Sequence, residues 1–140
     1  MKAVYLETSA LLAWMFGETA GVAVTRALDE AEVVVTSELT FVESGRAVRR
    51  ALSASLVKEG DAQRLQGLLA RQRSMWVTMS LSSSVLTRAG EGFPVEPVRT
   101  LDAIHLATAL AFTEAFPELA ILALDRRVSE NATALGLASA

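Results

Sequence analysis

The chain has 140 residues, 51% of them hydrophobic and 21% charged, a balance that excludes a disordered or collagen-like protein and can form one core. It has no Cys and one His, which excludes disulfides, thiolate zinc sites and iron–sulfur clusters. No apolar stretch approaches the roughly 18 residues of a membrane helix, and Glu7 comes too early for a signal peptide. We therefore expect one domain over residues 1–140, soluble and cytoplasmic.

The net charge is −3, whereas a protein that binds nucleic acid through electrostatics alone is usually basic. All basic residues except Lys2 and Lys58 are Arg, whose planar group suits phosphate and carboxylate partners. Two groups of these arginines either contact phosphate or form a solvated helical face, and both interpretations are open. These groups are Arg46, Arg49 and Arg50, and then Arg64, Arg71 and Arg73.

In the first half of the chain, short apolar runs alternate with longer amphipathic stretches. Thr8 or Ser9 is placed to cap the first helix, Gly17 to end it, and Ser37 to cap the helix after the second strand. Gly60 interrupts the last helical stretch of this half. The pattern predicts, in chain order, a strand over 3–6, helices over 10–16 and 18–30, a strand over 32–36, and helices over 39–52 and 55–73.

The second half continues the alternation, with Thr100 placed to cap the clearest helix and Gly136 to close the last one. It predicts a strand over 76–80, a helix over 82–89, a loop over 90–98, a helix over 101–116, a strand over 119–124 and a helix over 126–135. Strands that alternate with helices predict a parallel sheet covered on both faces. The expected fold is therefore α/β, in three αβα layers around a mostly parallel sheet of four to five strands.

Four carboxylates are candidates for a single site on this topology. Glu7 follows the first strand and Asp125 the last, and ligands bind at the carboxyl ends of the strands in open α/β sheets. Glu43 and Asp102 lie in apolar sequence near the starts of helices that begin at the same edge. A helix cap or a favourable dipole contact would explain some of these acids singly. Buried together they need a cation, and oxygen ligands without His or Cys suit Mg²⁺ or Mn²⁺.

Three segments, together with Glu43, carry a resemblance to a known family. They are Val-Tyr-Leu-Glu-Thr-Ser-Ala-Leu at 4–11, Arg-Thr-Leu-Asp-Ala-Ile-His-Leu-Ala-Thr-Ala at 99–109 and Leu-Asp-Arg-Arg-Val-Ser-Glu-Asn-Ala at 124–132. In order and spacing they resemble the PIN-domain family, and in particular the VapC-type toxins of bacterial toxin–antitoxin pairs. The resemblance covers essentially the whole chain.

The resemblance implies a PIN-like fold and a metal-dependent endoribonuclease that hydrolyses RNA with carboxylate-held Mg²⁺ or Mn²⁺. It places the catalytic acids at Glu7, Glu43, Asp102 and Asp125, with Glu7, Asp102 and Asp125 as metal ligands. It also implies a homodimer, which the apolar content of so short a chain favours as well. A cognate antitoxin is expected to block the acidic pocket with a basic side chain.

Two residues depart from the family pattern. The first acid of the family is normally Asp, whereas this chain has Glu7, one methylene longer. The family often has Thr or Ser two residues before its last acid, where this chain has Ala123. Because Mg²⁺ demands strict octahedral geometry, both departures bear on metal affinity and rate. The alternative function is therefore a catalytically weakened PIN-fold protein that acts mainly as an antitoxin- or RNA-binding partner.

Thr8, Ser9 and Arg126 are weaker candidates for positioning substrate or water, although Thr8 and Ser9 could equally cap a helix. His105 lies about one helical turn after Asp102, where a hydrogen-bonded structural His is favoured over a general acid.

An apolar cluster close to Glu7 has two open interpretations. Its side chains either pack in the core or line a groove for an amphipathic helix of the partner. The cluster consists of Leu11, Trp14 and Met15.

Overall fold

The computed structural model describes residues 2–140. Five strands form one parallel sheet in the order β3-β2-β1-β4-β5. The expectation of a mostly parallel sheet of four to five strands is thus confirmed, with the short fifth strand as an addition. The strands are β1 (Ala3–Leu6), β2 (Val33–Ser37), β3 (Val77–Met79), β4 (Ala120–Leu122) and β5 (Ala138–Ser139).

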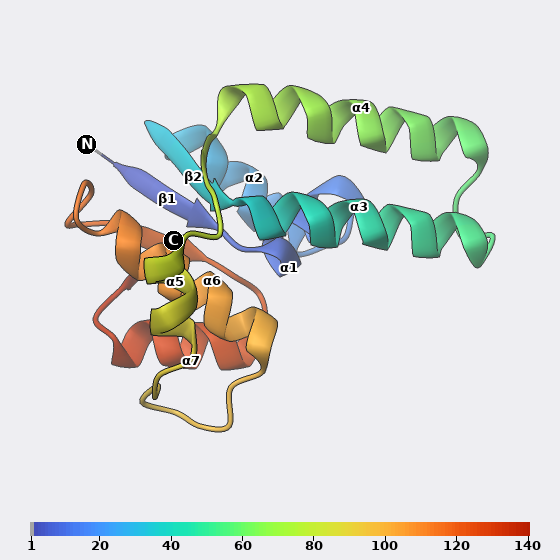
Figure 1. The fold of residues 1–140 in the computed structure, drawn as a ribbon. Helices are drawn as coiled ribbons and strands as arrows, with labels where there is room; N and C mark the ends of the chain where they lie inside the picture. The colour runs from blue at the N-terminus through green and yellow to red at the C-terminus, as the bar shows by residue number, and fades with distance from the viewer. Residues whose placement is uncertain (1) are drawn as a thin grey trace.

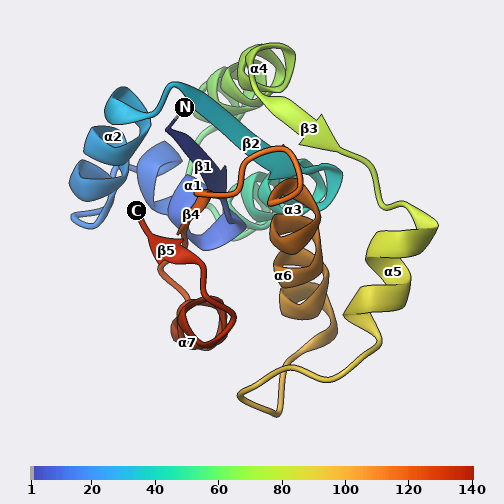
Figure 2. The same ribbon diagram turned by 90° about the vertical axis from the view of Figure 1, so that its left-hand side faces the viewer.

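Helices cover both faces of the sheet and make the three expected layers (Figures 1 and 2). On one side lie α1 (Thr8–Met15), α2 (Gly21–Glu30), α3 (Glu38–Ser53) and α4 (Glu59–Met75). On the other side lie α5 (Ser83–Ala89), α6 (Thr100–Phe112) and α7 (Arg126–Ala134). Helices α3 and α4 form a long antiparallel hairpin that extends beyond the sheet (Figure 1).

The central strand β1 divides its side chains between two cores, as the two-residue period of a strand requires. Tyr5 packs with residues of α6 and α7, whereas Val4 and Leu6 pack with residues of α1 to α4. All four β1 side chains are buried, which explains why its sequence is continuously apolar rather than alternating. The strand is therefore a rigid base for the residues that directly follow it.

Several helix boundaries differ from the sequence prediction: α1 begins two residues earlier, at Thr8, α2 begins three residues later, at Gly21, and α6 ends four residues earlier, at Phe112. The helix expected over 55–73 with a break at Gly60 instead begins at Glu59, so Gly60 lies in its first turn and does not interrupt it. Ser55 has a positive φ of 59°, which ends the preceding helix and keeps the linker out of helical geometry. Thr100 is the first residue of α6 rather than its cap, a position taken by Arg99, whose side chain does not bond the backbone of the first helical turn.

Among the helices of residues 2–140, none combines the length and the apolar character that would let it cross a membrane.

Candidate active site

The first strand, β1, lies at the centre of the sheet, and the side on which later strands are added changes there. Strands β2 and β3 extend the sheet on one side of β1, and β4 and β5 extend it on the other. The carboxyl ends of β1 and β4 are neighbours at this point, which is where open α/β sheets bind ligands. Glu7 directly follows β1, and Asp125 comes three residues after β4.

Ser9 connects these two strand ends. Its hydroxyl donates to the Glu7 carboxylate and accepts the backbone N–H groups of Leu124, at 2.9 Å, and Asp125, at 3.0 Å. The backbone N–H of Ser9 also donates to Glu7 Oε2 at 2.9 Å, which makes Glu7 the N-cap of α1. Ser9 therefore fixes the first and last candidate acids relative to each other, and Glu7, rather than Thr8 or Ser9, caps the helix.

Glu43 projects from α3 into a second, mostly buried cluster. Its Oε1 accepts the Thr8 hydroxyl at 2.7 Å and lies 2.6 Å from His105 Nε2. The other ring nitrogen, Nδ1, lies 2.8 Å from the Tyr5 hydroxyl, and both Tyr5 and His105 are fully buried. We call Tyr5, Thr8, Glu43 and His105 the Glu43 cluster. It joins β1, α1, α3 and α6 at one point.

The other two acids are joined by a basic residue. Arg99 Nε donates to Asp102 Oδ2 at 2.9 Å, and an Nη of the same guanidinium donates to Asp125 Oδ2 at 3.1 Å. Asp125 Oδ1 caps α7 by accepting the N–H groups of Arg127 and Val128. We call Arg99, Asp102 and Asp125 the Arg99 cluster. Its two aspartates present carboxylate oxygens to the same cation.

The loop before Arg99 is anchored to α7, which helps to place this residue. Both backbone polar groups of Val95 bond the side-chain amide of Asn131, at 2.9 and 3.0 Å, and Asn131 is fully buried. Arg127 donates to the carbonyl oxygen of Pro97 at 3.1 Å. The same helix whose cap is Asp125 thus also holds the segment that carries Arg99.

Both clusters border one surface hollow of about 250 Å³, lined by Glu43, Arg99, Thr100, Leu101 and Asp102. Within residues 2–140, no three acid or His side chains converge closely enough to hold a metal ion. Asp102 and Asp125 share one cation, the guanidinium of Arg99. The structure therefore places Glu43 in one cluster and Asp102 with Asp125 in the other, and Ser9 links Glu7 to the backbone of Asp125, so the four acids do not form a single ring of ligands.

The local environment shifts the pKa values of two of these acids in opposite directions. Burial raises the pKa of Glu7, and the hydrogen bonds from Ser9 offset this only in part. Burial also acts to raise the pKa of Glu43, but the hydrogen bonds from His105 and Thr8 outweigh it, and the net pKa is lowered. Glu43 is thus held as a carboxylate, whereas Glu7 retains its proton to a higher pH than an exposed Glu.

Arg126 directly follows Asp125, but its side chain bonds neither cluster. Its Nε bonds Glu130 Oε1 at 2.6 Å along α7, and its side chain is 90% exposed. Sequence reasoning missed Arg99, although it stands three residues before Asp102, a spacing that allows a contact around one helical turn. It also gave no role to Tyr5, which looks like an ordinary core residue of a strand.

The apolar cluster next to Glu7 divides between the two interpretations. Leu11 and Met15 are buried in the core between the sheet and α1 to α4, so they do not line an open groove. Trp14 is half-buried and packs against Trp76, with ring centroids 6.3 Å apart. An apolar hollow does lie close by, lined on α1 and α3 by Leu12, Phe16, Ala47 and Ala51 among others.

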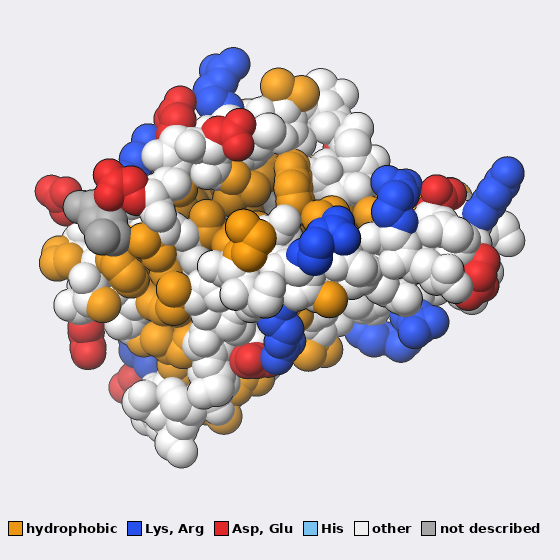
Figure 3. Space-filling model, turned by 90° about the horizontal axis from the view of Figure 1, so that it is seen from above, with side chains coloured by type: hydrophobic (Ala, Val, Ile, Leu, Met, Phe, Trp, Pro, Cys, Tyr) orange, Lys and Arg blue, Asp and Glu red, His pale blue; other side chains and the backbone are white. Residues whose placement is uncertain are grey.

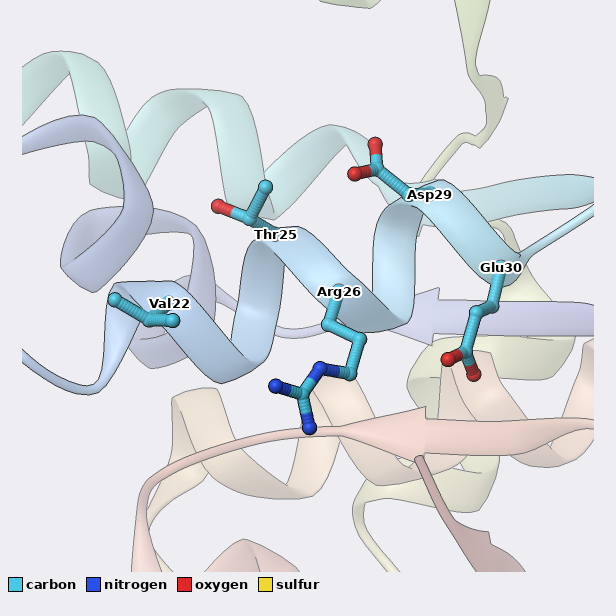
Figure 4. A pocket seen from close by; sticks show the side chains of 5 residues that line it. All are labelled: Val22, Thr25, Arg26, Asp29 and Glu30. Carbon is cyan, nitrogen blue, oxygen red and sulfur yellow. The ribbon is translucent and has the colours of Figure 1, made fainter.

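A larger hollow of about 570 Å³ lies on the outer face of α2 (Figure 4). One helix supplies all its lining side chains, and none belongs to the two clusters. They are Val22, Thr25, Arg26, Asp29 and Glu30.

Comparison with known proteins agrees with this geometry. The family model of the PIN domain matches residues 4–134. The chain belongs to the PIN-domain family. Ribonuclease VapC35 of Mycobacterium tuberculosis is 34% identical over 137 residues, which are 96% of this chain and 93% of VapC35. The resemblance seen in the three sequence segments is therefore confirmed, and the chain is a PIN-domain homologue of a VapC ribonuclease.

Solved structures of other proteins share the fold at low sequence identity. VapC20 from M. tuberculosis, described as a toxin that cleaves the sarcin–ricin loop, has a TM-score of 0.70 at 16% identity, and 98% of both chains are covered. VapBC2 from Rickettsia felis, bound to a DNA fragment of its promoter, has a TM-score of 0.63 at 13% identity. In that comparison 99% of this chain and 97% of the other are covered.

Proposed function

We propose that this PIN-domain protein is a VapC-type ribonuclease, the toxin of a toxin–antitoxin pair, and that it hydrolyses RNA phosphodiesters with a bound Mg²⁺ or Mn²⁺ ion. The observation that carries the proposal is the Arg99 cluster. Two aspartates from the starts of α6 and α7 direct carboxylate oxygens to one cation beside the carboxyl ends of β1 and β4. A site of this form suits a divalent cation as well as a guanidinium.

The donor set fits a hard divalent ion. Mg²⁺ keeps several waters and is usually held by one or two carboxylates, which Asp102 and Asp125 can supply. Glu7 is the third proposed ligand, and it lies at the same edge because Ser9 ties it to the backbone of Asp125. Metal binding there requires Arg99 to leave the aspartates, since both cations use the same lone pairs.

A bound divalent ion would supply charge neutralisation at the phosphate and a lower pKa for a coordinated water. The chain supplies the remaining functions. Glu43 has a lowered pKa, so its carboxylate is available to accept a proton from the attacking water. Thr8 and Ser9 do not face substrate in this account, because each bonds a candidate catalytic carboxylate. They position Glu43 and Glu7.

The RNA backbone is proposed to follow α3 away from the acids. Arg46, Arg49 and Arg50 are exposed on this helix, three to seven residues after Glu43, and form no ion pair with residues 2–140. Figure 3 shows Lys and Arg side chains spread over the surface of the α3–α4 hairpin. These positive groups provide phosphate contacts that compensate for the net negative charge of the chain.

The proposed macromolecular partners are a VapB-type antitoxin and a second copy of this chain. An antitoxin Arg entering the acidic pocket would find two aspartates already arranged for a guanidinium, as their contacts with Arg99 demonstrate. The homodimer remains a prediction from the sequence. Its test is the mass of the purified chain by light scattering at micromolar concentration.

An RNA cleavage assay tests the proposed function. The purified chain is expected to cut RNA with Mn²⁺ or Mg²⁺, to stop when EDTA is added, and to be inactive as Asp125→Asn. Asp29→Asn, which alters an exposed acid of α2, is the control and should cut normally. Metal-dependent binding of RNA without cleavage would instead support the alternative of a weakened PIN-fold binding protein. Neither binding nor cleavage would contradict the proposal.

A further inference from the structure

The only His of the chain lies at the centre of the Glu43 cluster. His105 is fully buried on α6, and its two ring nitrogens contact different partners. Nδ1 lies 2.8 Å from the Tyr5 hydroxyl, while Nε2 lies 2.6 Å from Glu43 Oε1 and 3.1 Å from Thr8 Oγ1. Each of these contacts reaches a side chain on another element.

The partners of the ring determine which nitrogen carries the proton. A Glu43 carboxylate only accepts hydrogen bonds, so the nitrogen that faces it must be the donor, Nε2–H. In the neutral ring Nδ1 is then an acceptor, and the Tyr5 hydroxyl must donate to it. A Tyr hydroxyl is protonated at neutral pH, so Tyr5 has the proton that it donates. All three groups are satisfied in this single arrangement.

The same arrangement leaves the two oxygens of Glu43 unequal. Thr8 and His105 both donate to Oε1, whereas no hydrogen bond from residues 2–140 reaches Oε2. Glu43 also lines the hollow next to Asp102 and retains partial exposure, with 25% of its side chain accessible. Oε2 is therefore the oxygen that remains for water or substrate.

We propose that His105 is a positioning residue of the ribonuclease site: as the Nε2–H tautomer held by Tyr5, it fixes Oε1 of Glu43 and so directs Oε2 to the water that is activated for attack. This inference rests on the proposed function only in its catalytic part. The hydrogen-bond arrangement itself concerns the folded protein and can be tested without RNA. A second-layer partner of this kind typically changes activity by about 10- to 100-fold when it is removed.

NMR of the ¹⁵N-labelled protein tests the arrangement directly, because one His gives one imidazole spin system. In neutral buffer, two-bond ¹H–¹⁵N correlations should show a protonated Nε2 and an unprotonated Nδ1. Tyr5→Phe removes the donor to Nδ1 and should shift that nitrogen or release the ring into a mixture of tautomers. A protonated Nδ1 with a bare Nε2 in the unmodified chain, or no response to Tyr5→Phe, would overturn the proposal.

Two substitutions of His105 test the catalytic part. His105→Leu removes the donor to Glu43 and should lower kcat by about 10- to 100-fold with little change in KM. His105→Gln keeps an N–H donor near the position of Nε2 and should recover most of that loss. Equal loss in both variants, or a loss confined to KM, would contradict positioning of Glu43.

A separate variant controls for loss of stability. Leu69→Ala opens a cavity under α4, outside both clusters, and should lower stability by about 2–5 kcal/mol without lowering kcat at a temperature where the protein stays folded. If the chain does not cut RNA at all, the proposed function fails while the NMR result still decides the hydrogen-bond arrangement. The two failures are therefore distinguishable.

Discussion

The Glu43 cluster and the Arg99 cluster lie at the same sheet edge but are built differently. The Glu43 cluster is mostly buried: Thr8 of α1 and His105 of α6 fix its carboxylate, and Tyr5 of β1 holds the other side of the His105 ring. The Arg99 cluster is more open: the side chain of Arg99 is 66% exposed and that of Asp125 is 27% exposed, although Asp102 behind them is only 10% exposed. In the Glu43 cluster, the buried donors Thr8 and His105 stay bonded to Glu43. In the Arg99 cluster, the exposed side chain of Arg99 can move away from the two aspartates.

This difference follows from the physics of each contact. A buried polar network loses the full desolvation energy of a group when one partner is removed, so its geometry is strongly determined. An exposed ion pair contributes little to stability and exchanges readily with water or another cation. We therefore assign proton transfer to the fixed carboxylate of Glu43 and metal exchange to the open pair, Asp102 and Asp125.

The largest expected effect comes from breaking the open pair. Asp102→Asn removes one of the two carboxylates that share a cation and should reduce RNA cleavage by on the order of 10²- to 10³-fold, the size seen when one transition-state contact is lost. Asp102 is buried, so its stability effect comes from a buried hydrogen-bonded group, but the Asn amide oxygen can still accept from Arg99, and stability should fall by no more than about 1–3 kcal/mol. Single-turnover cleavage rates measure the effect. Glu114→Gln, an exposed carboxylate lining a different hollow, is the charge-matched control; comparable rates in the two variants would remove Asp102 from the site.

Removing Arg99 tests whether its guanidinium competes with a metal ion for the two aspartates. Arg99→Gln frees both aspartates and should tighten Mn²⁺ binding by about 5-fold, because the metal no longer competes with a guanidinium. Titration calorimetry with Mn²⁺ alone measures this effect without RNA. Arg126→Gln, which breaks only the exposed pair with Glu130, should leave Mn²⁺ affinity unchanged. Weaker Mn²⁺ binding in Arg99→Gln would show that Arg99 supports metal binding rather than competing with it.

The acids could be predicted from sequence because topology alone brings strand ends and the starts of helices together. Glu7 and Asp125 follow β1 and β4, and these strands are neighbours at the edge where the predicted parallel sheet binds ligands. Arg99 could not be assigned in the same way. The direction of its guanidinium depends on the loop that Asn131 anchors to α7, a contact across 36 residues.

The fold was predictable where the periodicity extends over several residues and less so at element ends. The five-residue strand β2 is β-branched and clear from sequence, whereas β5 has two exposed residues and exists only because it pairs with β4. Because glycine lowers helix propensity, Gly60 predicts a break in the helix over 55–73. In the first turn of α4 that penalty is small beside the packing of α4 against α3.

The pH dependence of stability tests the burial of Glu7. Its pKa is raised in the folded protein, so the folded state binds the proton more strongly than the unfolded state does. The contribution of Glu7 to stability is therefore fully present below the ordinary pKa of Glu and is lost as the pH rises through the folded pKa. Glu7→Gln, whose amide oxygen can still accept the Ser9 N–H, should raise the free energy of unfolding by about 1 kcal/mol at pH 7.

The same substitution should have almost no effect near pH 4, where Glu7 is largely protonated in both states. Urea unfolding at the two pH values measures the difference. Glu32→Gln, an exposed residue directly before β2 and outside both clusters, is the matched Glu-to-Gln control. A stabilisation of equal size at both pH values would contradict the raised pKa of Glu7.

The smallest expected effect concerns the arginines of α3. Arg50→Gln, made in the Asp102→Asn background so that RNA stays intact, should weaken RNA binding by about 2- to 3-fold and reduce the salt dependence by about one phosphate contact. Arg26→Gln on the outer face of α2 is the matched control and should change neither quantity. Equal effects of both variants would indicate general attraction rather than a path along α3.

Asp102 and Asp125 are expected to exchange Arg99 for a divalent ion while the Glu43 cluster stays fixed. A crystal of the protein soaked in Mn²⁺ and measured at the manganese absorption edge tests it most directly. We expect an anomalous peak between the carboxylates of Asp102 and Asp125, with Arg99 moved away and His105 still bonded to Glu43. A map with no peak there and Arg99 still bridging the two aspartates, or with Mn²⁺ bound elsewhere, would contradict it.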